Sequence, residues 1–324
     1  MLDFPTIHKL GPNEMITEPG FYELPIERHH GQPCDGISIT SSKLRKIEKG
    51  TPADVWATHP LNPDRYEDKD TDALRMGRAM ALFIEGGPEK LEAGFWVLPH
   101  NKPRRPTLQQ VTAYNEGRAT EKGRESVEFW RDVEADPRDV ISEDEWDLIT
   151  SMGRVLAKSP DATAALGGTP EVTMAWRDEI NDLWCLARPD QLSFDGMLSD
   201  YKKVNTQGRP LTTYTIDARI DQHAYDMQMA FAAEGFHALT GVWPSKVGLI
   251  FQWDQPPYHV VLRAIDDEDL QIGAFLNREA RALFRHCLDT GNWFGPGEVI
   301  GSFQRNPKAR EALLERMQKA GTAP

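Results

Sequence analysis

The segment from Glu171 to Val204, EVTMAWRDEINDLWCLARPDQLSFDGMLSDYKKV, decides the fold of this 324-residue chain. Apolar side chains alternate with small or polar ones from Val172 to Arg177, which is the period of a half-buried strand. After the polar turn DEIND the apolar run LWCLA resumes, so the sequence predicts a β-hairpin. The run GMLSDYKKV predicts a third strand. The period changes at Pro170, which separates a mainly helical front half from a sheet.

Two aspartates and a lysine interrupt these apolar runs. Asp190 follows Pro189 at the end of the hairpin, and Asp200 and Lys202 lie two residues apart in the third strand. Side chains at that spacing project from the same face of a strand, so Asp200 and Lys202 are expected to point together, with Tyr201 on the other face. Asp190 can meet Asp200 if the strand that it ends pairs with the third strand.

Two interpretations of this group are open. Clustered carboxylates with one lysine are costly to bury unless a divalent cation lies between them, and Mg²⁺ or Mn²⁺ prefers such oxygen ligands. Lys202 would then orient or deprotonate a water molecule, or balance charge on a phosphate transition state. Alternatively, Asp190 only ends a turn, while Asp200 and Lys202 form an ordinary surface ion pair on an edge strand. Spacing alone favours this second interpretation, because the triplet D-x-K is common.

The order of the surrounding motifs resembles the PD-(D/E)xK nuclease superfamily, and more narrowly the phage-associated exodeoxyribonuclease VIII (RecE C-terminal) and RecB-type exonuclease group. The matching motifs run from Glu171 and Trp176 in EVTMAW, through ARPD and SDYK, to HAYDMQMAF with Tyr225 and Gln228. In the front half, SITSSKLRKI and MGRAMALFIEGG followed by FWVLP resemble that group's serine-containing segment, core helix and next strand. The likeness covers roughly 38–293 and depends on the order and spacing of short motifs.

This resemblance implies a restriction-endonuclease-like fold, an α/β domain with a mixed β-sheet core flanked by helices. It implies that Asp190 and Asp200 bind the metal ion and that Lys202 is the catalytic lysine. Tyr225 and Gln228 would share one face of the following helix, where relatives contact the DNA backbone or support the site. Core packing for Tyr225 and a solvated Gln228 are equally open.

Three further residues are expected to support the site. Glu171 either supports Arg188 or the metal ligands, or is structural. Lys203 belongs to a basic cluster with Lys202 and Arg209, in YKKVNTQGR, which adjoins the proposed site. Such a cluster is more often a solvated face, but here it would supply phosphate contacts.

The core helix departs from the pattern of the group. A histidine metal ligand is expected four residues after Gly77, and Ala81 stands there. Neither alanine nor the neighbouring methionine can serve a hard cation. Either Glu85, one turn further on, or water fills that position, or the site is weaker than in its relatives.

Composition argues against several other classes of protein. The net charge of −13 disfavours a broad basic surface for nucleic acid, although it permits a local basic groove. Three separated cysteines without a CxxC pair support neither a disulfide framework nor a four-cysteine metal site. There is no run of about 18 apolar residues and no signal-peptide pattern, which predicts a cytoplasmic protein without membrane contact. No GxxxxGK[ST] loop or GxSxG elbow is present.

The expected domain organisation has four parts. Residues 1–37 form an N-terminal extension, 38–300 the nuclease-like domain, about 104–160 a helical insertion within it, and 301–324 a C-terminal tail. Strands are also expected at KVGLIFQW and YHVVLRAI, joined by a DQPP turn. Helices are expected after a cap at 40–42, over about 71–85, over about 106–138 as one helix or a pair, from a Ser142–Glu145 capping box to Ser159, over about 216–234, and over about 267–288.

The motifs and the resemblance together predict a Mg²⁺- or Mn²⁺-dependent deoxyribonuclease. It would hydrolyse phosphodiester bonds from the ends of linear double-stranded DNA in phage-type recombination, in a bacterial or phage-infected cell. The resemblance also implies a homo-oligomer that acts with a single-strand annealing protein. A second hypothesis, motivated by Ala81, is a nuclease-fold protein that binds DNA ends or acts as a scaffold without turnover. A third is a globular protein in which Asp200 and Lys202 are an incidental ion pair.

Overall fold

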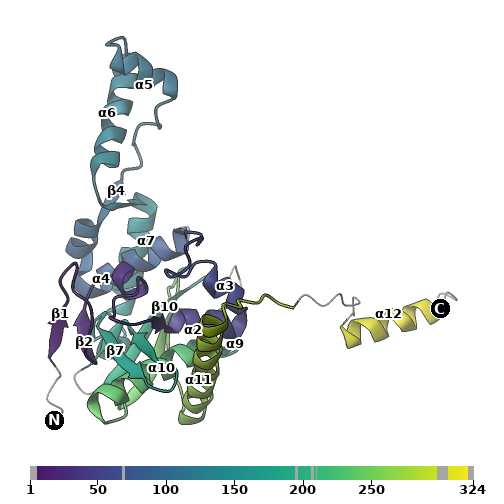
Figure 1. Ribbon diagram of the computed structural model, residues 1–324. Helices are drawn as coiled ribbons and strands as arrows, with labels where there is room; N and C mark the ends of the chain where they lie inside the picture. The colour runs from purple at the N-terminus through teal and green to yellow at the C-terminus, as the bar shows by residue number, and fades with distance from the viewer. Residues whose placement is uncertain are drawn as a thin grey trace.

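The computed structural model describes residues 6–67, 70–193, 196–205, 208, 210–297 and 306–319. Over these residues the chain forms sheets with both parallel and antiparallel strand pairs, and helices pack around them (Figure 1). The expected α/β class, with a mixed β-sheet core flanked by helices and a mainly helical front half, is therefore confirmed. In the described part of the chain, every helix is too short or too polar to cross a lipid bilayer.

The first sheet holds the predicted hairpin. Its strand order is β1 (Ile7–Lys9), β2 (Gly20–Glu23), β7 (Thr173–Asp178), β8 (Leu183–Ala187) and β3 (Ser38–Thr40). β7 and β8 pair antiparallel, with Trp176 opposite Cys185. β2 also pairs antiparallel with β7, so the described part of the expected N-terminal extension contributes strands to this sheet.

The second sheet carries the strand with the Asp–Lys pair. Its order is β12 (Val260–Ala264), β11 (Lys246–Trp253), β10 (Met197–Val204), β9 (Gln191–Leu192) and β6 (Thr169–Pro170). β10 runs parallel to β11, with Asp200 opposite Leu249, and antiparallel to β9. The sequence left open whether the hairpin strand pairs with β10, and the two strands lie in different sheets. β8 ends at Ala187, and after Arg188–Pro189 the chain enters the other sheet as β9, which takes the place beside β10.

One expected helix is two helices in the structure. α9 (Thr213–His223) and α10 (Tyr225–Thr240) replace the single helix predicted over 216–234. Ala224 between them is left-handed, with φ 50° and ψ 48°, and this breaks the helical hydrogen-bond series. The apolar spacing continues across the break, and alanine is the strongest helix former, so the sequence gives no sign of it.

α10 packs against strands of both sheets and joins them into one core. The ring centroids of Phe231 and Trp176 are 4.7 Å apart, and a Cβ added at Gly235 would lie 2.5 Å from the Trp176 ring. α11 (Asp267–Thr290) lies along α10, as the last helix that the sequence predicted. α2 (Ser41–Lys49) covers the same core with Leu44 and Ile47.

The front half adds a second helical layer. α4 (Asp72–Gly94) begins where the sequence predicted a helix, and the Thr71 hydroxyl caps it by accepting a hydrogen bond from the Leu74 N–H at 3.2 Å. Gly86 and Gly87 kink it near the predicted end. β4 (Phe95–Leu98) then pairs parallel with β5 (Asp139–Ser142), and α7 (Glu143–Leu156) starts at the predicted Ser142–Glu145 capping box. α8 (Pro160–Ala165) follows the cap Ser159.

The polar stretch after β4 forms the helix pair α5 (Leu108–Asn115) and α6 (Glu121–Ala135), which projects from the body in Figure 1. Trp130 anchors the pair by donating its indole N–H to the Pro103 carbonyl at 3.0 Å. The short helices α1 (Ile26–His30) and α3 (Pro52–Trp56) complete the body. α12 (Pro307–Lys319), from the expected C-terminal tail, stands apart from the body in Figure 1.

Candidate active site

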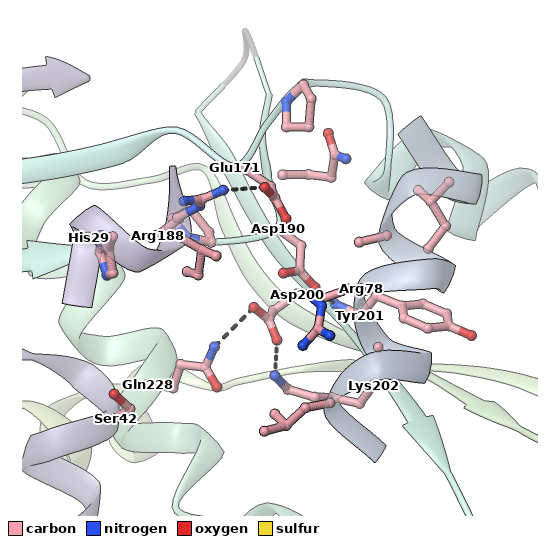
Figure 2. Close-up of a pocket in the computed structure, with 18 of the residues that line it drawn as sticks. His29, Ser42, Arg78, Glu171, Arg188, Asp190, Asp200, Tyr201, Lys202 and Gln228 are labelled. Atoms are coloured by element: carbon pink, nitrogen blue, oxygen red, sulfur yellow. Dashed lines mark hydrogen bonds and ion pairs between the residues drawn. The ribbon is translucent and has the colours of Figure 1, made fainter. Parts of the chain in front are cut away.

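A cavity of about 650 Å³ opens where the second sheet meets α10. One side is formed by β10, by the segment that leads into β9 and by the first turns of α10; α2 and α4 supply other parts (Figure 2). The three central residues of the sequence prediction, Asp190, Asp200 and Lys202, all line it. This predicted group comes from one short stretch of the chain, and segments that are distant in sequence supply the other walls of the cavity.

Asp200 and Lys202 share one face of β10, as the spacing predicted. The two side chains form an ion pair, and the Oδ1 atom of Asp200 accepts a hydrogen bond from the Gln228 side-chain N–H at 2.9 Å (Figure 2). Asp200 is only 2% exposed and lies on a strand that has neighbours on both sides. A surface ion pair on an edge strand, the alternative interpretation, is therefore wrong. A solvated Gln228 is wrong too.

Asp190 meets Asp200 across the β9–β10 pairing. Its Oδ2 atom accepts a hydrogen bond from the Tyr201 backbone N–H at 2.7 Å. The Tyr201 ring points to the other face, where its hydroxyl donates to Gln252 at 2.7 Å. Burial, reinforced by the negative charge of Asp200, raises the pKa of Asp190 to about 7. The site thus holds two neighbouring buried carboxylates, one of which binds a proton more readily than a free aspartate does.

Lys202 remains a cation in this environment. Burial disfavours its ammonium group, but Asp200 and Asp190 outweigh that effect and raise the pKa of Lys202. The ring of Tyr225, at the start of α10, covers the lysine with its centroid 4.7 Å from Nζ. A protonated lysine cannot act as a base, so this geometry favours charge balance over deprotonation of water.

Glu171 supports Arg188, one of the roles that the sequence left open. The two side chains form an ion pair, and Arg188 also donates to the Leu24 carbonyl at 3.1 Å. Glu171 has a positive φ of 52°, and its backbone N–H donates to the Asp190 carbonyl at 3.1 Å. The pair therefore holds the segment that carries Asp190.

The basic cluster after the active strand is only partly described. The Lys203 ammonium lies 3.2 Å from an Asp254 carboxylate oxygen, and both side chains are largely buried. Arg209 lies outside the described residues. A phosphate-binding role for Lys203 remains a prediction.

The opposite wall of the cavity is the face of α4 on which a histidine was expected. Gly77, Ala81 and Glu85 all line the cavity, but the Glu85 carboxylate is paired with Lys90. Across the described ranges there is no group of three or more His, Cys, Asp and Glu side chains arranged to hold a metal ion. The other carboxylates that line the cavity are Asp139, Glu171, Asp190 and Asp200, of which Asp139 is paired with Arg78 and Glu171 with Arg188.

The oxygen atoms around Asp200 nevertheless fit a hard cation. The side-chain oxygens of Gln191 and Gln228 are buried without a donor, whereas Asp200 Oδ2 is already paired with the Lys202 ammonium. Buried acceptors of this kind are costly unless something positive meets them. Carboxylate and amide oxygens are the ligands that Mg²⁺ and Mn²⁺ prefer.

Three residues at the cavity were missed by the sequence analysis. Arg45 of α2 donates to the His223 carbonyl at 3.0 Å and lies over the Tyr225 ring. His29 of α1 is buried against the Thr173 hydroxyl at 3.0 Å, and burial lowers its pKa well below the usual value. Arg78 of α4 faces the opening (Figure 2). Their convergence depends on how α1, α2 and α4 pack, and no local spacing encodes it.

Comparison with known proteins supports the fold. No protein-family model matches the sequence, and no curated protein matches it. Among solved structures, the chain is similar to a "putative exonuclease" from Eubacterium rectale, with a TM-score of 0.56 at 12% identity over 90% of this chain and 98% of that chain. A phage-related exonuclease from Haemophilus somnus 129PT also matches, with a TM-score of 0.32 at 12% identity over 59% of this chain and 92% of that chain. At such identities the first likeness shows a shared fold, and the second carries no argument.

Proposed function

We propose that this chain is a metal-dependent deoxyribonuclease of the PD-(D/E)xK class. It would hydrolyse phosphodiester bonds from the ends of linear double-stranded DNA, in phage-type recombination in the cytoplasm of a bacterial or phage-infected cell. The observation that carries the proposal is the buried group of Asp190, Asp200 and Lys202 at an open cavity. The fold shared with a structure named as an exonuclease supports it.

Each residue of the group has a distinct task in this proposal. Asp190 and Asp200 would hold Mg²⁺ or Mn²⁺, which when bound would polarise the scissile phosphate and acidify a water molecule. Lys202, kept protonated by the two carboxylates, would stabilise negative charge that develops on the phosphate. Gln228 fixes the rotamer of Asp200 through its hydrogen bond, and Tyr225 confines Lys202 from the other side. A buried and prearranged charge of this kind acts more strongly than one in water.

The substrate and partners follow from the resemblance. The proposal includes binding of double-stranded DNA ends, assembly into a homo-oligomer and cooperation with a single-strand annealing protein. DNA contacts by Tyr225, Lys203 and Arg188 belong to the same proposal. All three residues line the cavity or lie against Lys202, which is where a phosphate backbone would have to pass.

A specific observation also favours the second hypothesis, a nuclease fold that binds DNA ends without turnover. The α4 wall presents Ala81 to the cavity, and Glu85 is engaged by Lys90. The cation would then have fewer protein ligands than the resemblance implies. Such a site would bind metal weakly. The affinity for Mg²⁺ would fall more than the affinity for Mn²⁺, because Mg²⁺ gives up its hydration water less readily.

Substrate form and metal distinguish these functions. The purified chain would be incubated with linear or covalently closed circular duplex DNA, together with Mg²⁺, Mn²⁺ or a chelator. An exonuclease degrades the linear DNA alone and only with metal. Degradation of both forms would make it an endonuclease, and retention of linear DNA in a complex without degradation would establish the end-binding protein. Absence of both binding and degradation would refute both functions.

A further inference from the structure

Of the cavity cations Arg78, Arg188, Lys202 and Lys203, Arg78 is the most accessible. It follows Gly77 on α4, on the wall that faces Asp190 and Asp200 (Figure 2). Its side chain is 39% exposed, compared with 20% for Lys202 and 10% for Arg188. A DNA backbone that approaches the cavity would therefore meet the Arg78 guanidinium before it meets Lys202.

The guanidinium of Arg78 is held by two carboxylates. It forms two parallel hydrogen bonds with Asp70, at 2.9 and 2.8 Å, and contacts Asp139 with Nε at 3.2 Å and Nη2 at 2.6 Å. The carboxylate side chains are 51% and 47% exposed, so water and salt screen both pairs. Asp139 itself lines the cavity. Exchange of this carboxylate for a backbone phosphate would thus cost little, because one singly charged anion replaces another while Asp70 stays bound to the arginine.

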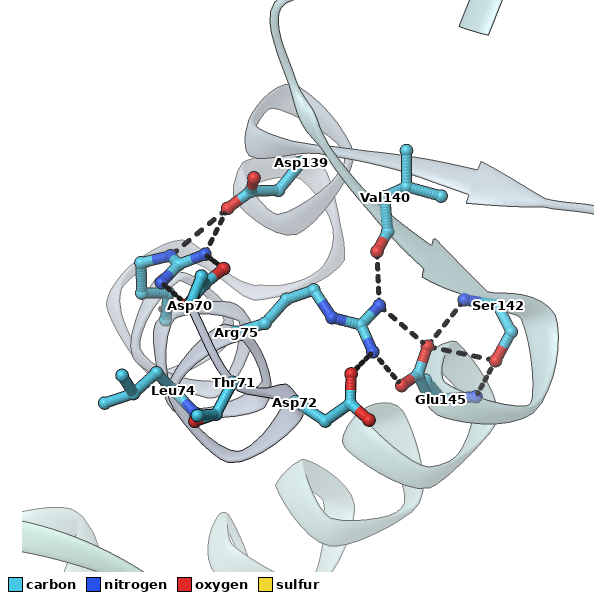
Figure 3. A network of polar contacts seen from close by, with 10 residues as sticks. Asp70, Thr71, Asp72, Leu74, Arg75, Asp139, Val140, Ser142 and Glu145 are labelled. Carbon is cyan, nitrogen blue, oxygen red and sulfur yellow. Dashed lines mark hydrogen bonds and ion pairs between the residues drawn. The ribbon is translucent and has the colours of Figure 1, made fainter. Parts of the chain in front are cut away.

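The neighbouring Arg75 shows what a purely structural arginine on this helix looks like. Its guanidinium binds Glu145 at 2.8 Å and Asp72 at 3.0 Å, and Glu145 also caps α7 together with Ser142 (Figure 3). Its side chain is only 22% exposed. Arg75 therefore already ties α4 to the β5–α7 junction. Arg78, one turn away, can change partner without releasing the helix.

We propose that Arg78 is a DNA-contacting residue, which exchanges Asp139 for a backbone phosphate of the bound duplex. Asp139 then acts as a competitor that occupies the arginine when DNA is absent. The guanidinium fork suits a phosphate in the same way as it suits a carboxylate. This inference rests on the proposed DNA-cleaving function, and it adds a phosphate contact on the α4 wall, opposite the carboxylates.

Binding in a cleavage-deficient background tests the proposal. The full chain with Asp200→Asn would be titrated against linear duplex DNA at several salt concentrations, alone and combined with Arg78→Gln, Asp139→Asn or the matched control Arg75→Gln. We expect Arg78→Gln to weaken binding roughly 10-fold and to reduce the salt slope by about 1, as for one lost phosphate contact. Asp139→Asn is expected to tighten binding, because it removes the competitor. Arg75→Gln should leave the salt slope unchanged.

The outcomes separate this inference from the proposed function. If the Asp200→Asn chain binds DNA but Arg78→Gln keeps the parental affinity and salt slope, the inference is wrong and the nuclease proposal stands. Weaker binding by Asp139→Asn would equally contradict it, because a structural pair, not a competitor, would then be lost. Thermal unfolding of each variant identifies a chain that has failed to fold. Absence of DNA binding in a folded Asp200→Asn chain would overturn both.

Discussion

At the residue scale, the candidate site depends on burial more than on residue type. A D-x-K triplet on an exposed strand is an ordinary ion pair, whereas here Asp200 is 2% exposed and its neighbour Asp190 has a pKa raised to about 7, chiefly by burial. Lys202 is held protonated between them. Charges arranged in this way are costly for folding and useful for binding a cation and a phosphate.

The buried His59, which lies outside the candidate site, gives a prediction on acid stability. His59 is 1% exposed, its ring stacks on Trp56, and its Nδ1 accepts a hydrogen bond from the Leu61 N–H at 3.3 Å. Burial lowers the pKa of His59 to about 4. Below about pH 6.5, His59 is therefore protonated in the unfolded chain but stays neutral in the folded chain. This difference lowers the free energy of unfolding as the pH falls toward 4.

The variant His59→Asn, which can still accept the hydrogen bond, should remove this contribution. The loss of stability between about pH 7.5 and about pH 4.5 is expected to shrink by at most about 3 kcal/mol in urea unfolding. His286→Asn, at an exposed position of α11, serves as the control for the substitution itself. An equal pH dependence in His59→Asn and wild type would contradict the assignment.

At the element scale, the break between α9 and α10 sets the direction of α10. Ala224 adopts the left-handed conformation, and Tyr225 and Gln228 in the next turn reach Lys202 and Asp200. A left-handed alanine is strained by roughly 1–2 kcal/mol, which glycine avoids. The strain is therefore located at the point where α10 presents its residues to the site.

The same substitution should have opposite signs at two positions of this region. Ala224→Gly is expected to raise the free energy of unfolding by up to about 1 kcal/mol, because relief of strain exceeds the entropic cost of glycine. Ala230→Gly, inside α10, should lower it by about 1 kcal/mol. Chemical denaturation of both variants checks this. Equal destabilisation would show that Ala224 is not strained.

The sequence predicted helices and strands well where side chains show a local period. It predicted poorly where the chain passes from one sheet to the other. The β7–β8 hairpin, β10, the β11–β12 pair and the Ser142–Glu145 capping box are confirmed, because each follows from side chains a few residues apart. The strand β9 has only two residues, which is too short to show a period. Alanine favours a helix, so the sequence gives no sign of the break at Ala224. Which strand lies beside β10 is decided by the whole sheet.

At the scale of the whole molecule, a buried arginine connects the hairpin to the two long helices. Arg281 of α11 is 4% exposed on its side chain, and it contacts Asp178 of β7 at 3.0 Å and Glu234 of α10 at 2.7 Å. Removal of the cation would leave two carboxylates together in the core. Loss of one partner from a buried ion pair typically costs about 3–5 kcal/mol.

Arg281→Met is therefore expected to destabilise the chain severely, by about 3 kcal/mol or more. Arg285→Met, one turn on in the same helix, removes an exposed pair with Asp289 and should leave the unfolding midpoint unchanged. Thermal and urea unfolding of the two variants provide the comparison. A mild effect of Arg281→Met would mean that the core tolerates the two acids without their cation.

The cavity itself belongs to this scale as well. Asp190, Asp200 and Lys202 could be grouped from the sequence because they lie within thirteen residues of one another. Arg45 and Arg78 reach the same opening only through the packing of α2 and α4. Glu171, Tyr225 and Gln228 were placed at the site by the resemblance, whereas no motif pointed to Arg45 or Arg78.

The most direct test of the account is the rate at which nucleotides are released from linear duplex DNA in the presence of Mg²⁺ or Mn²⁺. Metal-dependent release is expected from the wild type and from the control Asp147→Asn, which changes an exposed aspartate on α7. Asp200→Asn, whose side chain keeps the shape but loses the charge, should reduce the rate roughly 100-fold or more without unfolding the chain. Equal rates for Asp200→Asn and Asp147→Asn would contradict the assignment of the active site.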